Sequence, residues 1–342
     1  MIDALKALLR THSSTAKIYV RVRSCYWRIY DRLFFLWVSA KLGFPRSILT
    51  YGAAPGDNLL CSAVAHEMKR RGKRCMVVSS NYPELFDGNQ DVDKVIRRDD
   101  PRMTILRKYG LEKELEYASV DPGHTRSANP SEHIIAAMCR IAGIRGSIAL
   151  KPYFFLAQDE LQFGRFFQNQ VAIQSSGRGA QYYMLNKEWF PERFQQVVNH
   201  FLGRIPFVQI GSMQDPPLTG CLDLRGKTSI RQSAAILANS VAFVGQVGFL
   251  MHLARAVECP SVIVYGGREL PSQSGYSCNE NLCRRPECSP CWLWNDCEHD
   301  RICMKDIRVD EVCDALERLL GNRKTPPPAD MATITNDGNE HA

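Results

Sequence analysis

The sequence predicts an α/β protein with two successive halves, each built on a parallel sheet. Three observations lead to this prediction. A strand–loop–helix–strand pattern begins after Pro45, a second pattern of the same kind begins near residue 170, and 342 residues suffice for two domains that each bury a core. The hydrophobic fraction of 45% and the charged fraction of 23% are those of a globular protein.

Residues 1–45 form a basic arm in front of the first half. Residues 1–46 hold nine Lys or Arg and two Asp, and this excess equals the net charge of +7 of the whole chain. The other residues therefore balance to zero, so the sequence predicts no body-wide surface for nucleic acid.

A helix rich in aromatic residues is predicted inside the arm, over residues 26–44. Apolar side chains recur there with helical spacing at Tyr26, Ile29, Tyr30, Leu33 and Trp37, with Phe34 and Val38 widening the same face. The uncharged run 33–40 is far too short to span a bilayer. Two interpretations stay open: the helix lies on a membrane surface, or it packs on the body of the protein.

The first half, residues 46–165, opens with a predicted strand at 47–51. The loop 52–58 leads into a helix that continues to about Arg71, and a second strand is predicted at 74–80. A strand–helix–strand unit of this kind requires a parallel sheet. A further helix is predicted at 131–141.

The second half, residues 166–320, repeats the alternation of strands and helices. Strands are predicted at 170–176, 206–211, 241–245 and 261–267, and helices at 191–202, 230–238, 249–256 and 309–320. The tail, residues 321–342, is polar and rich in proline, which predicts disorder.

Ligands of open parallel sheets bind at the carboxyl ends of the strands. The sequence therefore predicts a cleft between the halves, built from the loops 52–58, 175–187, 211–217, 245–252 and 266–277. Asp57 lies in the first of these loops. It is either an N-cap of the following helix or a carboxylate that accepts a proton from a substrate hydroxyl.

The loops of the second half offer groups that suit a diphosphate. These are two hydroxyls, two cations and the start of a helix: Ser175, Ser176, Arg178, Lys187, Gly248 and His252. Taken singly, Lys187 is also typical of a solvated cation and His252 of a core histidine. The chain has neither the GxGxxG nor the GxxxxGK[ST] pattern, so no dinucleotide fingerprint or P-loop is predicted.

No secretory signal is recognised near the start of the chain, which predicts a reducing compartment. In such a compartment the thirteen cysteines are expected to be thiols or metal ligands and not a disulfide framework. We therefore expect a cytoplasmic protein, peripheral on the inner face of the plasma membrane if the arm binds lipid. Within the Cys-rich loop 278–303, four thiols in sixteen residues suit a structural zinc or iron ion: Cys288, Cys291, Cys297 and Cys303. The alternatives are packed reduced thiols, whose tryptophans lie under the C-terminal helix, and a thiol redox switch.

Several segments, in order, resemble glycosyltransferase family 9, the heptosyltransferases. They include "GDNLLCSAVAHEMKRRG", "LFDGNQDVDKVI", "DLRGKTSIRQSAAILANSVAFVG" and "MHLARAVECPSVIVYGG", and the resemblance covers about residues 46–320. It implies the GT-B architecture, with two Rossmann-like domains facing across a cleft. The first would bind the acceptor and the second the nucleotide-sugar donor.

The resemblance also implies a reaction and roles for single residues. The reaction is inverting transfer of a heptose-like sugar, typically from ADP-heptose, to a lipopolysaccharide or another lipid-linked or cell-envelope glycan, with no metal needed for catalysis. Asp57 falls on the catalytic aspartate of the family. Lys187 falls on the lysine that contacts the donor, and Ser175 and Ser176 fall in the phosphate-contacting loop.

The chain departs from the family where an aspartate, a serine or threonine and a glycine usually precede the "MH" pair. Val247, Gly248 and Phe249 stand at those positions. The insertion between Ser176 and Lys187 is also longer than the family pattern. These differences motivate an alternative function, in which a catalytically impaired GT-B relative serves as a membrane-associated scaffold for sugar binding or assembly.

Overall fold

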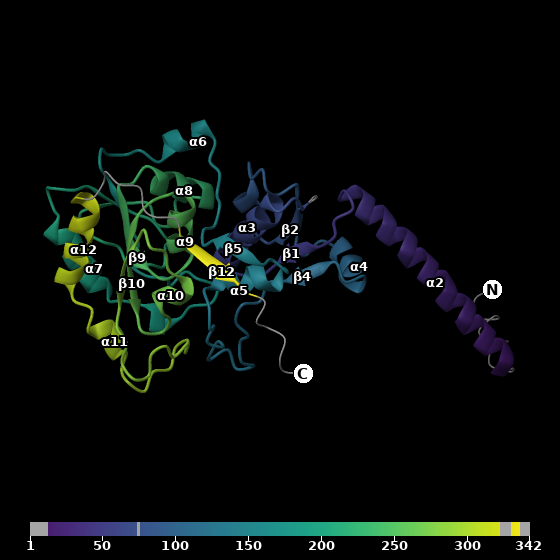
Figure 1. Cartoon of the computed structure of the whole chain (residues 1–342). Helices are drawn as coiled ribbons and strands as arrows, with labels where there is room; N and C mark the ends of the chain where they lie inside the picture. The colour runs from purple at the N-terminus through teal and green to yellow at the C-terminus, as the bar shows by residue number, and fades with distance from the viewer. Residues whose placement is uncertain (1–12, 74–75, 322–329, 336–342) are drawn as a thin grey trace.

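The computed structural model describes residues 13–73, 76–321 and 330–335, and two parallel sheets form its centre (Figure 1). The first sheet is made from residues 48–114 and the second from residues 171–283. The alternation of strands and helices that the sequence predicts is therefore present twice. The domain boundary at 165/166 stays a prediction.

The first sheet has the strand order β3-β2-β1-β4, and all its pairings are parallel. Its strands are β1 (Ile48–Thr50), β2 (Val77–Ser80), β3 (Lys94–Arg97) and β4 (Glu112–Glu114). Its helical segments are α3 (Pro55–Arg70), η1 (Pro83–Phe86), α4 (Arg102–Lys108) and α5 (Ile134–Ile141). The sequence did not predict β3 and β4, because these outer strands are short and rich in charge and lack an apolar run.

The second sheet has the order β8-β7-β6-β9-β10-β11, again with parallel pairings throughout. Counted along the chain, this is the order 3-2-1-4-5-6 of the Rossmann fold. The strands are β6 (Val171–Ile173), β7 (Phe207–Gln209), β8 (Cys221–Asp223), β9 (Ala242–Gln246), β10 (Ser261–Gly266) and β11 (Glu280–Cys283).

The helices of the second half lie between these strands along the chain. They are α6 (Gln158–Phe163), η2 (Leu185–Lys187), α7 (Pro191–His200), α8 (Ile230–Ala238), α9 (Phe249–Ala256), α10 (Pro271–Ser274), α11 (Ile302–Lys305) and α12 (Val309–Gly321). Pro191 begins α7, a position where its missing N–H leaves no helical hydrogen bond unmade. Ser229 caps α8 by accepting from the Gln232 amide.

Part of the tail is ordered, which corrects the prediction of disorder for residues 321–342. Strand β12 (Met331–Ile334) pairs antiparallel with β5 (Gly146–Ala149) in a small third sheet. Ile334 is buried in the main core and pairs with Gly146, a residue 188 positions earlier in the chain. The local composition gave no sign of this distant partner. The remainder of the tail, residues 322–329 and 336–342, lies outside the described residues.

The two halves share one hydrophobic core. It includes Leu59 and Val64 of α3 together with Leu250 and Leu253 of α9. The starts of these helices also meet, since a methyl group placed on Gly56 would lie 3.6 Å from Cα of Phe249. The core therefore sets the two sheets at a defined separation and places both helix starts at the same point.

Helix α2 (Ser13–Lys41) precedes β1 and extends beyond α4, away from both sheets (Figure 1). It is longer than the predicted helix at 26–44. Within the described ranges, no helix combines the length and apolar character that crossing a bilayer requires.

Candidate active site

The loops that follow the strands of both sheets enclose a single cleft of about 780 Å³. Its walls include residues 51–57 after β1, residues 174–188 after β6 and residues 246–252 after β9. These loops lie at the switch points, where the strand order of each sheet reverses. The prediction of the cleft from the strand ends is confirmed. The loop after β4, residues 114–118, also lines it and was not predicted.

Asp57 lies in the first turn of α3, at the floor of the cleft. It is not an N-cap, because the helix begins at Pro55 and its cap is Ala54. The carboxylate instead accepts a hydrogen bond of 3.2 Å from the hydroxyl of Tyr117, which follows β4. Gly52 makes room for it: its φ is +54°, and a side chain there would collide with the Asp57 carboxylate.

The environment of Asp57 raises the pKa of its carboxyl to about 6. Burial is the main cause, because it disfavours the charged form. The hydrogen bond from Tyr117 and the charge of Lys187 act in the opposite direction, and the charge of Glu269 adds to the rise. A carboxyl with this pKa is mostly ionised at neutral pH and is a stronger base than an ordinary aspartate.

Lys187 ends η2 and faces Asp57 from the second half. Its Nζ lies 2.8 Å from Oε1 of Glu269, which also binds Nη1 of Arg268 at 2.9 Å. Burial opposes ionisation of Glu269, but the charges of Lys187 and Arg268 outweigh it and lower its pKa to about 2. Two cations therefore share one carboxylate, and the cluster keeps one unit of positive charge.

This cluster matters because, apart from the histidines His124 and His252, the other ionisable side chains that line the cleft are acidic. Among the described residues that line it, Lys187 and Arg268 are the lysine and arginine, and the carboxylates are Asp57, Glu114, Glu116, Glu188, Asp215 and Glu269. An anionic ligand must therefore be met chiefly at Lys187, because the Arg268 guanidinium is 1% exposed and donates to Glu269 and to the carbonyls of Trp292 and Leu293. Sequence reasoning identified Lys187 and missed Arg268 and Glu269, although they stand in the predicted loop 266–277.

Ser175 and Ser176 lie beneath the loop after β6 and do not line the cleft. Both are fully buried. The Ser175 hydroxyl donates to the carbonyl of Pro216 at 2.6 Å, and the Ser176 hydroxyl donates to Oε2 of Glu188 at 2.6 Å. Since internal partners occupy both hydroxyls, the structure differs from the expectation of direct phosphate contact and gives these serines the role of shaping the loop. Arg178 is exposed and also lies outside the lining of the cleft.

Gly248 and His252 both line the cleft at the junction of β9 and α9. Gly248 is the N-cap of α9, as predicted, and His252 follows one turn later. Nδ1 of His252 lies 2.6 Å from the hydroxyl of Tyr276, and burial lowers the pKa of the imidazole to about 3. The ring is therefore neutral, and any contribution of this junction to anion binding comes from the helix start.

Asp215 was not singled out from the sequence, although its loop was. It is 1% exposed and accepts a hydrogen bond of 3.1 Å from the Ser212 amide. Burial raises the pKa of its carboxyl to about 6. The residue lines the wall of the cleft formed by the second half, and its Oδ1 has no hydrogen-bond partner among the described residues.

The Cys-rich loop 278–303 reaches across to the first half. The Trp294 amide donates to the carbonyl of Thr125 at 2.8 Å, its indole donates to the hydroxyl of Ser127 at 2.9 Å, and Leu293 forms an isolated bridge with Arg126. Trp292 and Trp294 line the cleft. The suggestion that the tryptophans lie under the C-terminal helix is therefore wrong: they close one end of the cleft.

The four predicted metal ligands lie in this loop and influence one another. Burial and the neighbouring Cys291 and Cys297 raise the pKa of Cys288, and the same two neighbours, after burial, raise that of Cys303. Across the described part of the chain, no three His, Cys, Asp or Glu side chains are arranged to hold an ion. The thiols thus suit a soft metal by chemistry and proximity, and the structure shows them without the geometry of a metal site.

Comparison with known proteins shows what this chain is similar to. The model of glycosyltransferase family 9 (heptosyltransferase) matches residues 210–298. The match runs from the residue that follows β7 into the Cys-rich loop, stops before Cys303, and includes Asp215, Arg268 and Glu269. The resemblance seen in the sequence is confirmed over this segment, where the chain is similar to glycosyltransferase family 9.

Solved structures of the same architecture cover most of the chain. E. coli ADP-heptose LPS heptosyltransferase II has a TM-score of 0.61 at 14% identity, over 82% of this chain and 100% of that one. Iron-containing dodecameric TibC of enterotoxigenic E. coli, in complex with ADP-D-β-D-heptose, has a TM-score of 0.63 at 16% identity, over 82% of this chain and 77% of that one. A family 9 glycosyltransferase of Veillonella parvula has a TM-score of 0.55 at 14% identity, over 80% of this chain and 97% of that one. The predicted GT-B fold is confirmed. A search of curated protein sequences gives no match.

Proposed function

We propose that the protein is an inverting glycosyltransferase that moves a heptose-like sugar from a nucleotide-diphosphate donor to a cell-envelope glycan. The observation that carries the proposal is the pairing of two groups across the cleft. The half-buried Asp57 carboxylate on the first half faces the Lys187–Glu269–Arg268 cluster on the second. One group suits an acceptor hydroxyl and the other suits a leaving diphosphate.

Asp57 is the general base in this proposal. It takes the proton of the acceptor hydroxyl while that oxygen attacks the anomeric carbon of the donor, through an oxocarbenium-like state. The bond from the anomeric carbon to the diphosphate oxygen breaks at the same time, on the opposite face of the sugar. The hydrogen bond from Tyr117 holds the carboxylate in place and helps to keep it ionised.

The departing diphosphate receives its positive charge from the second half. Lys187, supported by Arg268 through the shared Glu269 carboxylate, provides the cation. The start of α9 at Gly248 adds amide groups and a favourable dipole. Since these groups supply the neutralising charge, we propose that catalysis proceeds without a metal and persists in the presence of a chelator.

ADP-heptose is the first donor to test, because the solved TibC structure holds ADP-D-β-D-heptose. Lipopolysaccharide is the first acceptor to test, because the similar E. coli protein is an LPS heptosyltransferase. TibC is also described as iron-containing, which supports a structural iron or zinc ion at Cys288, Cys291, Cys297 and Cys303 of this chain.

The test combines donor binding and turnover in matched variants. Wild-type protein should be stabilised by its nucleotide-sugar, by roughly 2.7 kcal/mol at about a hundred times the dissociation constant. Asp57→Asn should keep this stabilisation and lose turnover by about a hundredfold or more. Lys187→Met should weaken donor binding, and Asp99→Asn, an exposed carboxylate of the same half, serves as the control. Near-normal turnover of Asp57→Asn would exclude Asp57 as the base.

The same experiment addresses the scaffold hypothesis. The Val247–Gly248–Phe249 segment removes side chains that family members place beside the donor. If wild-type protein binds nucleotide-sugars and transfers nothing to any acceptor tested, the scaffold function gains support. If wild-type protein transfers the sugar and the Asp57→Asn variant does not, the catalytic function gains support.

A further inference from the structure

We propose that the outward face of α2 binds the surface of an anionic phospholipid bilayer and holds the protein there. This inference does not rest on the proposed transfer reaction, because it concerns a surface outside the cleft and is tested by binding alone.

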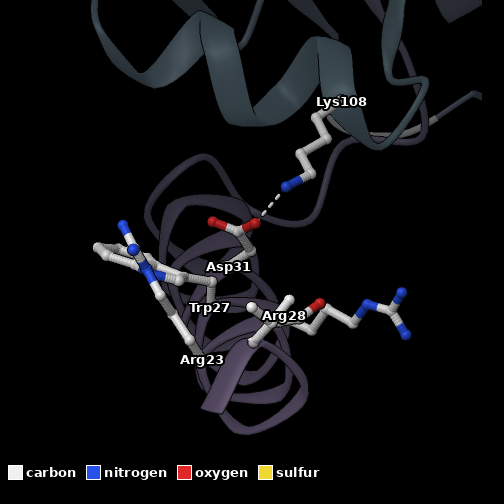
Figure 2. Close-up of a pocket in the computed structure, with 7 residues that line it drawn as sticks. Arg23, Trp27, Arg28, Asp31 and Lys108 are labelled. Atoms are coloured by element: carbon white, nitrogen blue, oxygen red, sulfur yellow. Dashed lines mark hydrogen bonds and ion pairs between the residues drawn. The ribbon is translucent and has the colours of Figure 1, made fainter. Parts of the chain in front are cut away.

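The C-terminal end of α2 is fixed to the first half. Val38 and Leu42 are buried in a cluster with Ile48 of β1, and the ring of Phe35 stacks on Tyr109 with centroids 4.2 Å apart. Asp31 forms an ion pair with Lys108 of α4 (Figure 2). These contacts set the direction of the helix relative to the body. Phe34 and Val38, predicted to widen the aromatic face, belong to this docked side instead.

The face that the sequence singled out, Tyr26, Ile29, Tyr30, Leu33 and Trp37, remains in solvent. The structure adds Val22 and Leu36 to it. Residues at intervals of four and three positions now form one stripe along the helix, widened by Tyr30 and Trp37: Val22, Tyr26, Ile29, Leu33 and Leu36. Each of these side chains is between 49% and 62% exposed. A row of exposed large apolar groups on one helix face marks a binding surface.

Basic residues border this stripe on both sides. At about 100° per residue, Arg21, Arg28 and Arg32 lie along one edge and Arg23 and Lys41 along the other. Asp31 is the one acidic residue in the sequence of α2, and it is bound to Lys108 on the docked side. The free surface of the helix is therefore apolar at its centre and positive at its edges.

This charge pattern decides between two occupants of the stripe. The alternation of four and three positions would also suit pairing with α2 of a second copy. Such pairing would bring the arginines of two helices together with no acidic residue to balance them. The stripe, with Tyr30 and Trp37, is also wider than a two-residue seam. An anionic bilayer complements both features, because its interface accepts aromatic side chains and its headgroups attract arginine.

The experiment is co-sedimentation of the full chain with vesicles of phosphatidylglycerol and phosphatidylethanolamine, compared with vesicles of phosphatidylcholine alone. Substitutions are preferred to deletion of α2, since deletion would uncover the buried cluster around Val38 and Leu42. One variant removes the apolar centre (Ile29→Ser, Leu33→Ser, Leu36→Ser) and another the charged edge (Arg21→Gln, Arg28→Gln, Arg32→Gln). Leu202→Ser is the control, because Leu202 is 65% exposed on the second half.

We expect binding to the anionic vesicles to fall by tenfold or more in both triple variants and to stay at the wild-type level in the control. Wild-type binding should also weaken at high salt and be much lower on phosphatidylcholine. Unchanged melting temperatures would show that the variants fold. Equal binding of wild type and both variants would overturn the proposal. The proposal would also be overturned if wild-type protein does not bind vesicles and forms a dimer that the same substitutions dissociate.

Discussion

At the scale of single residues, Asp57 shows how a cleft changes the chemistry of an ordinary side chain. The sequence left two roles open for Asp57, a helix cap or a base. The structure excludes the cap, because α3 begins at Pro55, two residues before Asp57. Burial then raises the pKa of the carboxyl to about 6, while Tyr117 and Lys187 limit the rise. The same residue is thereby exposed to substrate, held by one hydrogen bond and kept near its titration point at neutral pH.

The Tyr117→Phe substitution should move the pH dependence of kcat/KM. In the wild type, activity should rise as pH increases through about 6, because the base acts only when deprotonated. The Tyr117 hydroxyl stabilises the ionised carboxylate, so its loss should shift this acidic limb upward by roughly 0.5–1 pH unit. Tyr82→Phe, in the same cleft, should leave the limb in place. An unshifted limb in Tyr117→Phe would contradict this account.

The Asp57→Asn substitution should stabilise the fold while it abolishes turnover. The folded-state pKa of Asp57 lies above its unfolded value, so the native state binds the proton more tightly. The contribution of Asp57 to the free energy of unfolding is therefore highest below about pH 4. It falls as pH rises through about 6, where the carboxyl must ionise in the folded protein. The neutral amide avoids this loss, and we expect a gain of roughly 1–3 kcal/mol at pH 7. Thermal unfolding at pH 4 and pH 7 tests it, since the gain should nearly vanish at the lower pH.

At the scale of elements, the Cys-rich loop 278–303 is one of the segments that connect the two halves outside their shared core. Its centre pairs with residues 125–127 and places Trp292 and Trp294 against the cleft. Its shape therefore affects the site directly, although none of its cysteines lines the cleft. A metal at the four thiols would fix the loop and hence the wall that these tryptophans form.

Freshly purified, reduced protein should contain about one zinc or iron ion per chain, measured by elemental analysis. Cys288→Ser should lose the metal and lower the melting temperature, because binding contributes folding free energy to a loop with few aliphatic residues. The thiol pKa values of Cys288 and Cys303 are raised, so the metal must displace protons and its affinity should increase with pH. Cys221→Ser, on strand β8, is the control for loss of a thiol. Well under one metal per chain would favour the packed-thiol interpretation.

At the scale of the whole molecule, the chain leaves the first half, completes the second and then returns. Strand β12 pairs with β5, and Ile334 is buried in the core that the halves share. The ends of the described chain are thus fastened to the first half, α2 by its last turns and β12 by its ladder. The cleft lies between bodies that are joined by a common core and by the returning strand.

Ile334→Asp should destabilise the whole protein rather than the tail alone. A carboxylate at this buried position has no partner, and such substitutions typically cost about 2–4 kcal/mol. Thr335→Asp, at the exposed neighbouring position, should change the melting temperature little. If β12 separates from β5 in this variant and the global unfolding transition does not change, β12 is only a local attachment.

The sequence by itself determined the elements with strong local patterns. Buried apolar strands such as β1, β6 and β10, and the helices that follow them, have a periodicity that burial on a parallel sheet enforces. The positions of Asp57, Lys187 and Gly248 at strand ends were predictable for the same reason, because carboxyl ends of parallel strands meet at one edge.

Only the tertiary structure decided the rest, because it depends on partners that are distant along the chain. The edge strands β3 and β4 are charged, and β12 pairs with a strand that lies 182 to 188 residues earlier in the chain. The Glu269 carboxylate, the Tyr117 hydroxyl and the two tryptophans reach the cleft from separate loops, and the serines predicted to contact phosphate turn inward to internal partners. Which face of α2 packs and which stays in solvent was likewise fixed by the surface of the first half, since both faces of that helix are aromatic in sequence.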